Sequence, residues 1–198
     1  MNNIFCLCAG RTASTSFAKA CSHITNFTSA HESLVSTLST RRLDYPSHHI
    51  EIDNRLVWFL PQLNKKFADE DTFYVHLKRN KIDVAKSYLE RWHIKESIVK
   101  AYGHGILMKN KISEAKKMSI CLDYVEHVES SIDIFLENRT NKMVMDITNL
   151  KQTFPEFHHK IQAEGNLNLC LDEFDKISNK NKTNIVKANF KKIIRLFN

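Results

Sequence analysis

Short apolar runs alternate with longer amphipathic stretches over the first 150 residues of the chain. The run from Ile4 to Ala9 is apolar at every position, which is typical of a strand that is buried on both faces. Runs of this kind, and runs rich in β-forming residues, predict strands at 4–9, 26–30, 49–52, 72–77 and 142–147. Apolar positions three and four residues apart predict helices at 14–24, 32–39, 54–67, 81–92, 113–138 and 185–196.

Strands that alternate with helices favour a parallel sheet, because parallel neighbours are joined by crossover connections that are usually helical. We therefore expect an α/β fold with three layers, in which helices flank a parallel sheet of about five strands. The scarcity of glycine (4) and proline (3) also argues for long helices. No repeat, low-complexity segment or linker divides the sequence, so a single domain over residues 1–198 is predicted.

The charge balance indicates an anionic partner. The formal net charge is +7, which suits a nucleotide, a phosphorylated metabolite or an acidic glycan. Much of the excess lies between Lys176 and Arg195, where a solvated basic helix face is the preferred interpretation. No aromatic and glycine-rich motif of an RNA-binding module is found, so a nucleic-acid partner is not expected.

The cysteines and the hydropathy pattern predict a cytoplasmic protein. Five cysteines at irregular spacing form no disulfide framework or zinc motif, which favours a reducing compartment. No apolar run approaches the length of a membrane span, and no signal peptide is expected before the strand that begins at Ile4. The sequence does not indicate an oligomeric state.

The first candidate for chemistry is the loop from Gly10 to Ser16. It connects the first predicted strand to the first helix, where free backbone N–H groups and the helix dipole favour an anion. Arg11 adds a guanidinium group, and hydroxyl groups follow at Thr12, Ser14, Thr15 and Ser16. An ordinary N-cap rich in Ser and Thr is the alternative. The loop lacks the Gly-Lys-Ser/Thr end of a Walker A motif, which weakens an ATPase or kinase interpretation.

A second candidate follows the strand at 72–77. Arg79 lies just beyond the end of this strand, where ligands bind in open parallel sheets. Ser87 lies about two turns into the next helix, so the two side chains can clamp one phosphate. The alternative is that Arg79 pairs with Asp83 at the start of that helix, which would contribute little to stability.

These two motifs together resemble the sulfotransferase family. The stretch from Gly10 to Phe17 is similar to the loop that binds the 5′-phosphosulfate in that family, although Ala13 stands where Gly is usual. Arg79 and Ser87 resemble the pair that grips the 3′-phosphate of the donor. A weaker similarity lies at 143–150, where Asp146 matches a supportive acidic residue. The resemblance covers roughly residues 3 to 155 and implies the P-loop NTPase-like sulfotransferase fold.

The resemblance also implies an activity. The chain would transfer a sulfuryl group from 3′-phosphoadenosine 5′-phosphosulfate (PAPS) to a hydroxyl of a glycan, a lipid or a small metabolite, without a metal. The donor would be bound by Gly10, Arg11, Thr12, Ala13, Ser14, Thr15, Ser16, Arg79 and Ser87, and Arg11 would also offset charge on the leaving oxygen. The family's C-terminal glycine-rich nucleotide segment is not found, so either the lysine-rich tail replaces it or the adenine site is more open.

The general base and the acceptor are less defined by the sequence. His31 and Glu32 follow the second predicted strand, and either residue could take the proton of the acceptor hydroxyl, or Glu32 could orient His31. A polar loop pair without a catalytic role is the alternative. The pair Asp53-Asn54 is a second candidate, for which a plain helix cap is preferred. Segments 32–47 and 93–112 are expected to select the acceptor. A nucleotide or metabolite kinase and a non-catalytic nucleotide-binding relative remain as alternatives.

Overall fold

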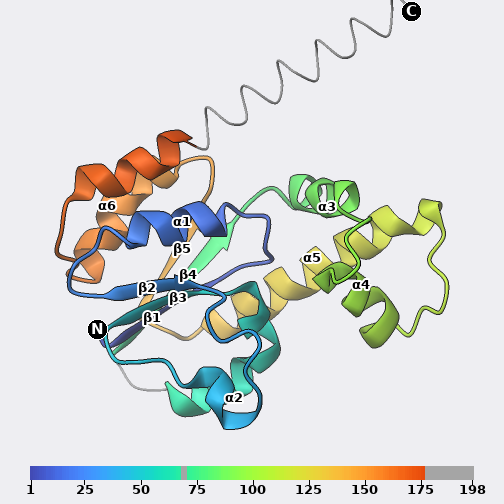
Figure 1. The fold of residues 1–198 in the computed structure, drawn as a ribbon, viewed down its shortest axis with the longest axis horizontal. Helices are drawn as coiled ribbons and strands as arrows, with labels where there is room; N and C mark the ends of the chain where they lie inside the picture. Colours follow the sequence, from blue (N-terminus) through green and yellow to red (C-terminus); the bar gives the residue numbers. More distant parts are fainter. Residues whose placement is uncertain (68–70, 177–198) are drawn as a thin grey trace, which may run out of the picture.

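A parallel sheet with helices on both faces forms the described part of the chain, as the alternating pattern predicted (Figure 1). The computed structural model describes residues 1–67 and 71–176. Five strands lie in the order β2-β3-β1-β4-β5. Their bounds are β1 Asn3–Leu7, β2 Thr28–His31, β3 His49–Ile52, β4 Thr72–Lys78 and β5 Lys142–Asp146. All neighbouring strands are parallel, so their carboxyl ends lie at one edge of the sheet.

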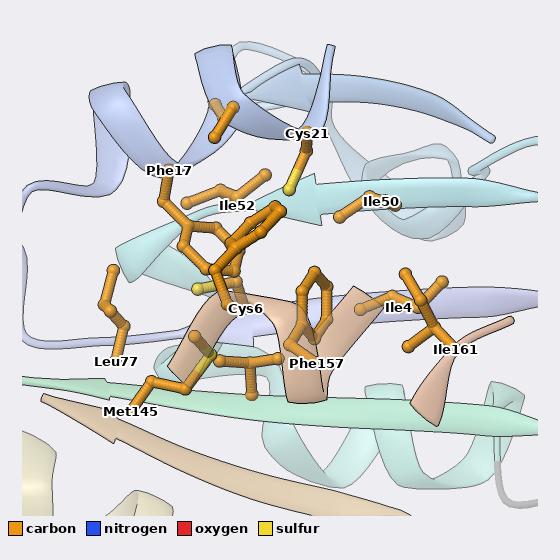
Figure 2. Packing of buried hydrophobic residues seen from close by; sticks show 14 of the residues in the cluster. Ile4, Cys6, Phe17, Cys21, Ile50, Ile52, Leu77, Met145, Phe157 and Ile161 are labelled. Carbon is orange, nitrogen blue, oxygen red and sulfur yellow. The ribbon is translucent and has the colours of Figure 1, made fainter. Parts of the chain in front are cut away.

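Alternate residues of the central strand face two separate hydrophobic cores. Ile4 and Cys6 of β1 pack with helices α1 (Ser14–Cys21) and α6 (Leu150–Lys160), as Figure 2 shows for this first core. Phe5 and Leu7 pack on the opposite face. Because side chains alternate along a strand, an uninterrupted apolar run is what a strand between two helical layers requires. The three-layer α/β fold is therefore confirmed.

The second core joins the sheet to the remaining helices. The long helix α5 (Glu114–Leu136) contacts α3 (Lys81–Glu90), and its N-terminal half projects beyond the sheet beside α3 and α4 (Ile98–Ala101) in Figure 1. Two further elements on this face are the 3-10 helix η2 (Asn54–Phe59) and helix α2 (Leu60–Lys66). A π-helical turn η3 (Tyr102–Ile106) follows α4.

Two expected helices differ in the structure. No helix forms over 32–39; turns occupy 33–36, and the 3-10 helix η1 (Ser39–Leu43) follows them. The helix expected over 54–67 begins as η2 and becomes α-helical only at Leu60, because Pro61 sits in the first turn of α2, where its missing N–H is not needed. The helix expected over 185–196 lies outside the described residues.

Candidate functional site

The carboxyl ends of four adjacent strands carry the residues that the sequence analysis selected. The loop 10–13 follows β1, His31 is the last residue of β2, Asp53 follows β3 and Arg79 follows β4. The chain also changes direction at β1, since β3 lies on one side of it and β4 on the other. Ligands of open parallel sheets bind at such a switch point, outside the carboxyl ends of the strands.

The loop after β1 has an unusual backbone. Gly10, Arg11 and Ala13 have φ angles of 76°, 58° and 58°, in the left-handed region that residues with a Cβ rarely adopt. Ala13 occupies the N-cap of α1, where no side chain caps the helix, and its carbonyl accepts from the N–H groups of Ser16 and Phe17. The Ser/Thr hydroxyls are therefore not used as the helix cap, and the ordinary N-cap alternative does not describe this loop.

Two tyrosines hold the backbone at the start of the loop. Tyr88 of α3 and Tyr124 of α5 both donate to the Ala9 carbonyl, at 2.7 Å and 3.2 Å. A Cβ on Gly10 would lie 2.3 Å from the Tyr88 hydroxyl, so only glycine fits between the loop and this ring. Burial raises the pKa of both phenols, which keeps them neutral donors. The loop is thus held by helices that come much later in the sequence.

Arg79 and Ser87 meet this loop directly. The Arg79 guanidinium donates to the Arg11 carbonyl at 3.0 Å, and Arg11 Nε donates to Ser87 Oγ at 3.1 Å. Arg79 therefore braces the loop instead of pairing with Asp83. The resemblance implied that the two motifs bind opposite ends of one nucleotide, whereas in the structure the side chains of Arg11 and Ser87 contact each other.

Positive charge is concentrated around Arg11. Burial lowers the pKa of this half-buried guanidinium, and the nearby charges of Arg91 and Arg79 lower it further. In the part of the chain that the structure describes, no carboxylate forms an ion pair with Arg11, Arg79 or Arg91. Unpaired cations that repel each other in a partly buried site favour an anionic ligand.

Arg91 was not selected from the sequence. It is the C-cap residue of α3, four residues after Ser87. Residues at that spacing share a helix face, so this signal was available once Ser87 had been chosen.

The two candidate bases have different partners. His31 Nε2 lies 3.0 Å from Ser14 Oγ at the start of α1, which ties the end of β2 to the loop. Glu32 has a left-handed backbone with φ 56° and forms an ion pair with Arg55 at 2.6 Å. Glu32 is therefore engaged by a cation, while the hydroxyl of Ser14 orients His31.

The preferred interpretation of Asp53 as a helix cap is confirmed. Its carboxylate accepts from the Arg55 N–H at 2.7 Å at the start of η2, and it also pairs with buried Arg42. Burial raises the pKa of this carboxyl, against the lowering effect of the Arg55 N–H and of Arg42. No sequence signal identified Arg42, because the partner of a buried carboxylate is chosen by tertiary packing.

The remaining predicted residues are placed differently around the loop. Thr12 is fully buried, so its hydroxyl is not expected to reach a ligand. Thr15 is exposed and Ser16 is half-buried on the first turn of α1. Asp146, at the end of β5, accepts from the N–H and hydroxyl groups of Thr148 at 2.8 Å and 2.6 Å, which fits a supportive role. The proposed contribution of the lysine-rich tail lies beyond residue 176, outside the described residues.

Metal-ligand clusters and membrane-spanning helices are both absent from the described residues. Within residues 1–67 and 71–176, no group of three or more His, Cys, Asp or Glu side chains is arranged to hold a metal ion. No helix in the same ranges has the length and hydropathy needed to cross a membrane.

The comparisons with known proteins give the same fold. No protein-family profile and no curated sequence matches the chain. Solved structures do match, among them the "Sulfotransferase Domain from the Curacin Biosynthetic Pathway", with a TM-score of 0.61 and 12% identity over 84% of this chain and 75% of that one. Another is mouse sulfotransferase SULT7A1 complexed with PAP, with a TM-score of 0.57 and 13% identity over 83% of this chain and 60% of that one. The predicted sulfotransferase fold is therefore confirmed.

Proposed function

We propose that the chain is a sulfotransferase that moves a sulfuryl group from PAPS to the hydroxyl of an acceptor. One observation carries the proposal: Arg11, Arg79 and Ser87, from two distant motifs, meet at one strained loop at the carboxyl edge of the sheet, and no carboxylate of the described residues pairs with either arginine. Half-buried guanidinium groups without counterions suit a ligand with several phosphate or sulfate oxygens. The sulfotransferase fold of the chain supports the same assignment.

The two motifs would bind different groups of the donor. The N–H groups at the start of α1, with Arg11 and Ser14, would hold the 5′-phosphosulfate. Arg79 and Ser87 would bind the 3′-phosphate, the group that distinguishes PAPS from ATP. Arg11 already donates to Ser87, so a bound phosphate would give this guanidinium an anionic acceptor in place of a neutral hydroxyl.

Transfer would proceed in line between two oxygens. The acceptor oxygen forms a bond to sulfur while the bond from sulfur to the bridging oxygen of the 5′-phosphate breaks, and 3′-phosphoadenosine 5′-phosphate (PAP) leaves with that oxygen's negative charge. Arg11 would offset this charge. His31 would accept the hydroxyl proton, since the charge of Glu32 is already engaged by Arg55.

We also propose a cytoplasmic setting for the protein. All five cysteines are free and buried in the structure, which agrees with the reducing, cytoplasmic compartment expected from their spacing.

Nucleotide preference tests the proposal. Thermal stability of the full chain would be measured with PAP, AMP and ATP at equal concentrations, because a ligand that binds only the folded state raises the melting temperature. We expect the largest shift with PAP. Replacing Arg79 with alanine (Arg79→Ala) removes a charged donor, so PAP should bind about 30-fold more weakly, the equivalent of about 2 kcal/mol.

Lys160→Ala, at the end of α6, is the matched control because it also removes one positive charge. Its PAP shift should equal that of the unmodified chain. Equal shifts with PAP and AMP would contradict the assignment. A magnesium-dependent preference for ATP would support the kinase alternative instead.

A further inference from the structure

An open cleft of about 730 Å³ lies beside α4, on the second-core side of the molecule. Its wall runs from the end of α3 to residue 112 and includes Trp92, Ile98 and Ile112, while Arg55 contributes from η2. The volume is typical of a site for a small molecule. A long glycan chain would need an extended groove, so the size of the cleft restricts what it can receive.

An ion pair and a charge effect link this cleft to the region of the strained loop. Arg55 lines the cleft and pairs at 2.6 Å with Glu32, which is the neighbour of His31. On the other side, Trp92 follows Arg91, and the charge of Arg91 acts on Arg11 after the larger effect of burial. The cleft is thus linked through Arg55 to the segment that carries His31, and through the residue before Trp92 to the charges around Arg11.

The lining combines apolar walls with positive charge. An indole ring and isoleucine side chains form the apolar part, and Lys95 and Lys100 supply two cations against the single acid Glu96, while the charge of Arg55 is paired with Glu32. Lys100 is half-buried on α4, and neither lysine forms an ion pair with a described residue. A partly buried ammonium group without a counterion favours a ligand that supplies a negative charge.

We infer that this cleft receives the acceptor, and that the acceptor is a small apolar hydroxyl compound carrying an anionic group. The inference rests on the proposed function and narrows its acceptor class. The apolar body would lie against Trp92, and the anionic group would pair with Lys100 or Lys95. The hydroxyl would then lie at the Arg55 end of the cleft, where the pair with Glu32 leads to His31.

Tryptophan fluorescence provides a test that needs no turnover. Trp58→Phe leaves Trp92 as the sole tryptophan, and phenylalanine suits the site because the buried Trp58 Nε1 has no hydrogen-bond partner. The probes are 3-(4-hydroxyphenyl)propionate and its methyl ester, which share one body and differ in charge. We expect both to change Trp92 emission and the carboxylate to bind about fivefold more tightly, as one exposed ion pair provides.

Charge reversal at one lysine completes the test. Lys100→Glu in the Trp58→Phe background should abolish the preference for the carboxylate, whereas Lys109→Glu, an exposed lysine outside the cleft, should retain it. Equal affinity for the two probes, or equal effects of the two lysine variants, would overturn the inference.

The PAP shift, measured on the same proteins, separates the two proposals. If the PAP shift persists while the carboxylate preference is missing, only the acceptor inference fails. If the preference persists without any PAP shift, the cleft still binds anions but its role as an acceptor site falls with the proposed function.

Discussion

Ala13 holds a conformation in which a side chain is unfavourable. Its φ of 58° lies in the left-handed region, where a Cβ costs about 1 to 2 kcal/mol and glycine is free of that cost. The chain therefore retains strain at the entry to α1. Strain of this kind is commonly held at functional sites by the surrounding structure.

Ala13→Gly should stabilise the protein. Relief of the left-handed strain exceeds the added entropy of the unfolded chain, so the free energy of unfolding should rise by about 0.5 to 1 kcal/mol. Urea unfolding measures this change. Ala18→Gly, inside α1 and buried, is the matched control and should destabilise by about 1 kcal/mol. Destabilisation of similar size at both positions would show that Ala13 is not strained.

His31 and Glu32 can be separated by their partners. His31→Asn keeps a polar group near Ser14 but removes the base, so transfer to any hydroxyl acceptor used by the unmodified chain should slow about 100-fold or more. The PAP shift should persist. Glu32→Gln should have a smaller effect, because this carboxylate pairs with Arg55. A larger loss of rate in Glu32→Gln would assign the base to Glu32.

At the scale of elements, a buried polar cluster joins β4 to α5. His76, fully buried on β4, has Glu129 Oε2 3.3 Å from one ring nitrogen and Asp133 Oδ1 3.1 Å from the other. Lys78 lies 2.9 Å from Asp133 and 3.7 Å from Glu129. The cluster therefore fixes the strand that leads into Arg79 against the longest helix.

Removing the histidine should show how much this cluster contributes to the free energy of unfolding. His76→Leu leaves buried Glu129 with a weak contact to Lys78, so the free energy of unfolding should fall by about 3 kcal/mol in chemical denaturation. The double variant His76→Leu/Glu129→Leu replaces the pair with apolar groups and should recover most of this loss. A double variant no more stable than the single one would mean that packing, not the unpaired charge, causes the loss.

Acid should weaken the same contact between β4 and α5. Burial alone would raise the pKa of Asp133, but the hydrogen bond from Lys78 and the charge of His76 bring it below the ordinary value of 3.8. A carboxyl whose pKa is lowered by folding stabilises the protein above its unfolded pKa, and this contribution is lost as the pH falls through the folded value. The stability difference between the unmodified chain and Asp133→Asn should therefore shrink below about pH 3.8. A difference that stays constant in urea titrations down to pH 2 would contradict this.

The central strand was predictable from the sequence because burial on two faces left no polar position between Ile4 and Ala9. Helices were harder to predict where a proline lies in the segment. Pro61 lies in the first turn of α2, which follows η2, and Pro155 lies inside α6, which was not predicted as an element. The loop after β1 was found because its residue types fit an anion. The ion-pair partners of Glu32 and Asp53 were not found, since the choice of Arg55 and of Arg42 depends on how distant segments pack.

At the scale of the whole molecule, two cores share one sheet. Phe157 of α6 is fully buried in the first core and contacts Phe17 and Phe154, with ring centroids 5.3 Å and 5.4 Å apart. Trp58 and Trp92 pack against the second core, on the other face. Because β1 contributes alternate residues to both cores, loss of packing on one face should be transmitted to the other.

Phe157→Leu tests this coupling, since tryptophan fluorescence reports on the face that the substitution does not touch. The variant should lose about 1 to 2 kcal/mol of unfolding free energy, with the same denaturation midpoint by fluorescence and by circular dichroism. Glu156→Ala, on the exposed side of the same helix, should change stability by less than about 0.5 kcal/mol. If the fluorescence midpoint of Phe157→Leu stays unchanged while the dichroism midpoint falls, the two layers unfold separately. The site would then depend on the second core alone, because Tyr88 and Tyr124, which hold the loop, both belong to it.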